Sequence, residues 1–208
     1  SASATAELAG TARQVGGLIS QLQRERLLTA GYLAAGSASS VDLMNQQRMV
    51  LDTADALYHS PAAANEELSR ALVRLRSLSE LRESTLRRGA SVDSVARAYN
   101  AVIEAVIDSL RLVPQDTSDA VGTRQLTALD ALLRANEQGS LAGMALVAAT
   151  INPQTAQVLH TEASAQSQMF TERFVQQSDA TQAGMVVLVD QGDLARQVRS
   201  LAGQQPVG

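Results

Sequence analysis

The feature that most constrains the fold is an apolar spacing of three and four residues, which recurs through most of the 208-residue chain. It is clearest between Ser91, a residue type that caps helix starts, and Pro114, a residue type that ends helices. The repeat there consists of Val92, Val95, Tyr99, Val102, Val106 and Leu110. Side chains at this spacing line one face of an α-helix, and heptad repeats are typical of helices that pack in bundles. The chain is therefore predicted to be all-α.

The same pattern, with capping residues, prolines and glycines at its ends, predicts further helices on both sides of this segment. The predicted helices cover residues 8–36, 41–59 after Ser40 as N-cap, 61–88 after Ser60, 92–113, 119–150, 152–178 with Asn152 and Pro153 at its start, a weaker segment 179–189, and a short helix ending near Leu201. The apolar run at residues 185–189 has no partner strand in the sequence, so a buried helical turn is the simpler interpretation. We expect one elongated up-down helical domain over residues 1–208, with halves of about 1–114 and 115–208.

Composition excludes several classes of function. The net charge is −4 and the arginines are scattered, which argues against a nucleic-acid surface. The chain has no cysteine, and His59 and His160 are not at a metal-ligand spacing, so neither a metal nor a cofactor is expected. No apolar run approaches the length of about 20 residues that spans a bilayer. Contact with a membrane is therefore expected only through regions outside this chain.

Two charged residues interrupt the apolar stripe of the predicted helix over residues 8–36. When the heptad is carried forward from Leu18 it reaches Glu25, and Arg26 lies directly beside it. In a structural interpretation, Glu25 accepts hydrogen bonds from a neighbouring helix or pairs with an arginine, while Arg26 lies along the surface with its stem packed. In a functional interpretation, a partly buried Arg26 guanidinium, fixed by packing, binds an anion whose planar oxygens match its donor fork. Spacing alone leaves both open.

A second unusual face lies on the predicted helix over residues 119–150. Its large residues, among them Leu133, give way to Asn136, Ser140 and Gly143 on the same side. These small residues either line a cavity or let two helices approach closely.

No catalytic residues are predicted. The acidic pairs Glu66–Glu67 and Glu80–Glu83 lie near arginines on amphipathic helices, where solvated ion pairs are the ordinary explanation. Neither histidine lies in a context that would activate a serine or threonine, and His160 is expected to be packed or half-exposed.

Three segments are similar to one known family. LISQLQRERLLTAGYLAAG, residues 18–36, resembles the signature Leu-Gln-x-Glu-Arg-x-x-(Ser/Thr)-Ala-Gly-Tyr of the nitrate- and nitrite-sensing domain. ARAYNAVIEAVIDSL, residues 96–110, is similar to the family's Tyr-Asn-x-Leu-Ile segment, with Tyr99 and Asn100 in the matching places. LTALDALLRANEQGSLAGMAL, residues 126–146, resembles a Leu-rich stretch of the family.

The resemblance implies two four-helix bundles that share long helices, and a sensory role in bacterial receptors. Together with the Ala- and Arg-rich composition, it predicts the extracytoplasmic input domain of an actinobacterial-type two-component sensor histidine kinase, with the kinase outside this chain. It also implies a small anion, such as nitrate or nitrite, bound between helices, with Arg26 and Glu25 as the ligand-binding residues. A homodimer is expected in the full receptor.

The chain departs from the family pattern at Asn136 and Gly143, where the family usually has Lys or Arg. Anion capture by several donors would then need Arg134, Arg124 or Arg173 from a shifted position. The alternative is a protein-interaction or dimerisation domain that binds no ligand.

Overall fold

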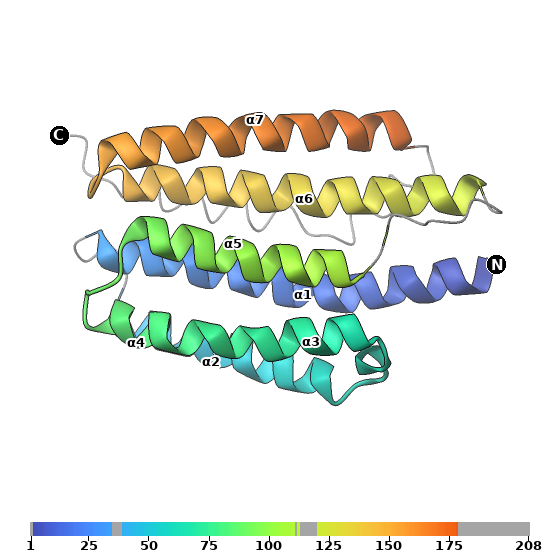
Figure 1. Cartoon of the computed structure of the whole chain (residues 1–208), viewed down its shortest axis with the longest axis horizontal. Helices are drawn as coiled ribbons and strands as arrows, with labels where there is room; N and C mark the ends of the chain where they lie inside the picture. Colours follow the sequence, from blue (N-terminus) through green and yellow to red (C-terminus); the bar gives the residue numbers. More distant parts are fainter. Residues whose placement is uncertain (1, 35–38, 111, 113–119, 179–208) are drawn as a thin grey trace.

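The computed structural model describes residues 2–34, 39–110, 112 and 120–178, with side chains from Gly10 onward. Within this part of the chain every regular element is helical, so the all-α prediction is confirmed. The elements are α1 (Ala2–Leu33), α2 (Ser40–Tyr58), the 3-10 helix η1 (Pro61–Ala64), α3 (Glu66–Arg74), the 3-10 helix η2 (Leu75–Leu78), α4 (Ser79–Leu86), α5 (Val92–Ser109), α6 (Ala120–Ala148) and α7 (Pro153–Gln177). They run up and down along one long axis (Figure 1).

Helix α1 is central to the arrangement because it packs against α2, α5 and α6. Helices α2, α3 and α4 form one side of the molecule, and α6 and α7 form the other (Figure 1). Helix α6 packs on both α1 and α5, whereas α7 packs chiefly on α6. Residues near the middle of α1 therefore meet both sides of the bundle.

The core is aliphatic and follows the predicted seams. All six residues of the repeat that begins at Val92 are buried, and so are Val15, Leu18 and Leu22 on α1. No helix in the described ranges is both long and apolar enough to cross a membrane.

Several helix ends differ from the sequence prediction. The N-cap of α2 is Ser39 rather than Ser40, because the Oγ of Ser39 accepts a hydrogen bond from the amide of Asp42. The predicted helix after Ser60 is not one α-helix. Residues 61–64 form a single 3-10 turn, Asn65 then caps α3 through its Oδ1, and a second 3-10 turn separates α3 from α4.

The heptad helix that begins after Ser91 ends earlier than predicted. Its last residue is Ser109, and Leu110 is its C-cap. Pro114, the weaker segment over 179–189 and the helix expected to end near Leu201 lie outside the described residues.

Candidate functional site

Glu25 and Arg26 lie in the middle of α1, and both are 0% exposed. Successive helical residues point about 100° apart, so the two side chains face different neighbours. Charged side chains with no solvent contact need partners, because an unpaired buried charge is very costly. The structure supplies a separate set of partners for each.

Glu25 faces α4 and α5. Its carboxylate accepts two hydrogen bonds from the Arg82 guanidinium, Nε to Oε1 at 2.7 Å and Nη2 to Oε2 at 3.0 Å. The hydroxyl of Tyr99 donates to Oε1 of Glu25 at 2.6 Å. Glu25 therefore joins three helices.

The electrostatics of this triad follow from its burial. Burial alone lowers the pKa of Arg82, but the hydrogen bonds and the charge of Glu25 raise it overall, so the guanidinium stays charged. Burial, followed by the charge of Glu25, raises the pKa of Tyr99 well above its usual value. Tyr99 is thus held as a neutral hydrogen-bond donor.

Arg26 faces α6. Its Nη1 donates to Oε2 of Glu137 at 2.8 Å and its Nη2 to Oε1 at 2.7 Å, the two-pronged geometry that favours arginine over lysine. Nη2 also donates to Oγ of Ser140 at 3.1 Å. Asn100 on α5 donates to Oε2 of Glu137 at 2.8 Å, and Gln23 on α1 donates to Oε1 at 3.3 Å.

The guanidinium of Arg26 does not lie along the surface, so that part of the structural interpretation is wrong. Arg26 sits where α1 packs on α6, and the buried hydroxyl of Ser140 accepts its hydrogen bond. Gly143 is also buried. Nε of Arg26 has no hydrogen-bond partner among the described residues. The guanidinium thus retains one buried donor beside its carboxylate partner.

Anion capture by several donors would need Arg134, Arg124 or Arg173 beside Arg26. Arg134 instead lies 20% exposed among three carboxylates: Glu104, Asp108 at 2.6 Å and Asp130 at 3.1 Å. Burial alone lowers the pKa of Arg134, but the hydrogen bonds to Asp108 and Asp130 raise it overall. Burial raises the pKa of Glu104, and the charge of Arg134 opposes that shift. The positive charge of Arg134 is therefore already balanced by carboxylates of its own chain.

The other two arginines lie elsewhere. Arg124 is exposed on α6, and the guanidinium of Arg173 lies 5.5 Å from the ring centre of Phe170 on its own helix. Contact of either with an anion at Arg26 stays a prediction.

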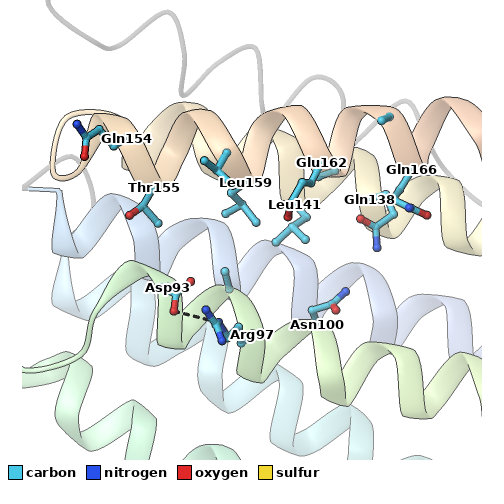
Figure 2. A pocket seen from close by; sticks show the side chains of 14 residues that line it. Asp93, Arg97, Asn100, Gln138, Leu141, Gln154, Thr155, Leu159, Glu162 and Gln166 are labelled. Carbon is cyan, nitrogen blue, oxygen red and sulfur yellow. Dashed lines mark ion pairs between the residues drawn. The ribbon is translucent and has the colours of Figure 1, made fainter.

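A groove of about 1050 Å³ lies between α5 and the α6–α7 pair. Figure 2 shows its labelled side chains, which are mostly amides and carboxylates, with the exposed pair Asp93–Arg97 on the α5 side. Asn100 lines this groove and also binds Glu137, so the groove reaches the buried network through one side chain. None of Asn136, Ser140 and Gly143 lines it, and the contact of Ser140 with Arg26 favours the close-packing interpretation of that face.

The acidic residues on the amphipathic helices and His160 lie in the surroundings that the sequence predicts. The pairs Arg70–Glu66 at 3.1 Å and Arg87–Glu83 at 3.8 Å are solvent-exposed, as predicted. Nδ1 of the half-buried His160 lies 3.2 Å from the carbonyl oxygen of Ala142. Among the described residues, no group of three or more histidines and carboxylates is arranged to hold a metal ion.

Sequence reasoning missed two partners. The burial of Arg82 could have been predicted from a signal in the sequence. Arg82 continues the heptad row of Leu68 and Leu75, just as Glu25 continues the row of Leu18. Glu137 also carried a signal, because it lies four residues from Leu133 and from Leu141, on the apolar face of its predicted helix.

The three segments that resemble the sensing family meet in this network. Glu25 and Arg26 come from the first, Tyr99 and Asn100 from the second, and Glu137 from the third. The fold and the network define a helical bundle whose central helix is tied to both sides by buried charge.

The family described as nitrate and nitrite sensing matches residues 17–205, nearly the whole chain. The chain therefore belongs to the nitrate- and nitrite-sensing family, whose description is one of sensing and not of catalysis. No curated protein and no solved structure matches the chain.

Proposed function

We propose that this chain is the non-enzymatic, ligand-sensing input domain of a bacterial receptor. Family membership and the helical bundle support the sensing role. The finer proposal is the extracytoplasmic region of a two-component sensor histidine kinase in an actinobacterial-type organism. It rests on the resemblance of the three segments and on the Ala- and Arg-rich composition.

The proposed ligand is a small planar anion, nitrate or nitrite, and the proposed binding residue is Arg26. The observation that carries this is the complete burial of a guanidinium between helices that different parts of the chain supply. A buried guanidinium binds an oxyanion more strongly than an exposed one, because water competes less for both groups. The proposed role of Glu25 is to fix the part of α1 that presents Arg26, through Arg82 and Tyr99.

In this proposal the signal is a change of helix packing. An anion at Arg26 stabilises one position of α1 against α6, and the bundle shifts towards that position in proportion to the ligand's preference for it. Displacements of about 1–2 Å between packed helices are sufficient for such transitions. The shift would pass along the helix ends towards a membrane-anchored kinase.

The test is thermal unfolding of the domain at constant ionic strength, with chloride replaced by nitrate, nitrite, sulfate or acetate. Specific binding to the folded state raises the midpoint by mass action, so we expect a saturable rise for nitrate or nitrite. Arg26→Lys keeps the charge but loses the donor fork and should abolish that rise. Arg97→Lys, at an arginine 80% exposed beside the groove, is the matched control and should keep it. A flat response of the wild-type protein to every anion would refute anion sensing.

The second candidate is a ligand-free dimerisation domain. It is favoured by the fact that Arg26 already binds a carboxylate of its own chain, and by an exposed stripe on α2. Val41, Met44, Leu51 and Tyr58 recur there at spacings of three and seven residues and are all at least 46% exposed. A dimer that Leu51→Glu dissociates, and that no anion affects, would support this candidate. Light scattering after size-exclusion chromatography measures that outcome.

A further inference from the structure

The Glu137 carboxylate has the surroundings of a bound ligand. Each of its oxygens receives two hydrogen bonds, and three side chains on α1 and α5 donate all four: Arg26 twice, Asn100 and Gln23. Glu137 is 0% exposed. The donors that surround this carboxylate therefore come entirely from helices other than its own.

We infer that Glu137 is a resident anion, which occupies the place on Arg26 that a free planar monoanion would take. This inference rests on the proposed role of Arg26. A carboxylate carries one delocalised negative charge over two coplanar oxygens, as nitrite and formate do. A free anion of that kind can accept all four hydrogen bonds without any change in the positions of Gln23, Arg26 and Asn100.

Because both are negatively charged, a free anion and the Glu137 carboxylate compete for Arg26. Arg26 is the cation bound to Glu137, so a second anion placed beside the pair meets no net positive charge: the repulsion by Glu137 offsets the attraction by Arg26. At the effective dielectric of protein sites, such a like-charge contact weakens binding by about a hundredfold or more. An external anion therefore binds at Arg26 only after the Glu137 carboxylate leaves. Glu137 sets the ligand threshold of the domain.

The matching experiment removes the resident anion. Glu137→Ala deletes the carboxylate and leaves space for a small one, while the four donor groups remain. We expect its unfolding midpoint in chloride to fall below that of the wild-type protein, and to rise saturably with formate, acetate, nitrite or nitrate. The half-maximal concentration should be about a hundredfold lower than for the wild-type protein. Sulfate, a tetrahedral dianion, should have no such effect.

Three variants make the result specific. Glu104→Ala removes another carboxylate of the α5–α6 contact, but its partner Arg134 keeps Asp108 and Asp130, so anions should not rescue this variant. Combining Glu137→Ala with Arg26→Lys should abolish the rescue. If Glu137→Ala is unfolded in chloride, Glu137→Gln removes the charge and keeps the shape, and it should respond to nitrate at lower concentration than the wild-type protein.

The inference is overturned if folded Glu137→Ala or Glu137→Gln responds to all anions as the wild-type protein does, or if Glu104→Ala is rescued equally. This failure is distinct from failure of the proposed function. A wild-type domain with an Arg26-dependent nitrate response, and no gain on removal of Glu137, would retain the function and refute the inference. If the unfolding midpoint of the wild-type domain responds to no anion while that of Glu137→Ala rises with nitrate, the inference is retained and the proposed function is refuted.

Discussion

Replacement of Arg82 by methionine should be among the most destabilising single changes in the bundle. The substitution keeps much of the apolar stem, but it leaves the Glu25 carboxylate at 0% exposure with Tyr99 as its one remaining side-chain partner among the described residues. Removing one partner of a buried pair costs about 3–5 kcal/mol, because the remaining charge stays desolvated and uncompensated. We expect that loss in the free energy of unfolding.

The cost should depend on the stranded charge rather than on lost packing. Glu25→Gln in the Arg82→Met background removes the charge and still offers an oxygen to the Tyr99 hydroxyl. The double variant should therefore be more stable than Arg82→Met alone, by about 1–3 kcal/mol. Urea unfolding followed by helical circular dichroism, with linear extrapolation, measures each corner of this cycle.

Arg70→Met is the matched control, because its pair with Glu66 is 71% and 85% exposed. Exposed pairs of this kind contribute about 0–1 kcal/mol. If Arg82→Met costs no more than Arg70→Met, or if its effect and that of Glu25→Gln simply add, the argument from buried charge is refuted.

Three other changes probe the fold at separate points. The pKa of Tyr99 is raised above its unfolded value, so the contribution of this hydroxyl to the free energy of unfolding is complete below pH 10 and is lost as the pH rises. Above pH 10 the free energy of unfolding should therefore fall by about 1.4 kcal/mol per pH unit from this group. Tyr99→Phe should remove that slope in urea titrations at pH 9–11. Asn65 caps α3 and donates to the carbonyl of Ser109 at 2.9 Å. Asn65→Ala should therefore cost about 1–2 kcal/mol in urea unfolding and Asn65→Asp, which keeps the cap, less; equal losses would contradict the capping role. A Cβ at Gly17 meets nothing within 4 Å, so Gly17→Ala should raise stability by up to about 1 kcal/mol, and a lowered thermal midpoint would contradict this.

The sequence predicted most of the fold because the signals for helices are local. The α5 seam and its cap at Ser91 are visible within about twenty residues, and so is the start of α7 after Asn152. The errors are also local in origin. Ser39 and Ser40 are equally good capping residues, and only the three-dimensional path of the chain decides which one meets the amide of Asp42.

The site was predicted only in part, because its partners are distant in the chain. The heptad placed Glu25 in the core and left open a pairing with an arginine, which Arg82 provides from 57 residues away. The partner of Arg26, Glu137, lies 111 residues away, and their meeting depends on the relative register of α1 and α6. Periodicity within one helix carries no information about that register.

The two buried pairs give α1 a property that apolar packing alone would not. Glu25 ties it to α4 and Arg26 ties it to α6, so a sliding movement of α1 must disturb both pairs. When a buried ion pair is stretched, each charge loses its partner but gains no water. Positions of α1 between two packed states therefore cost more free energy than either packed state. The charges in the apolar stripe should therefore favour a small number of discrete positions of α1. Discrete packing states, and not a continuous range, are what a helical bundle needs to transmit a signal along its length.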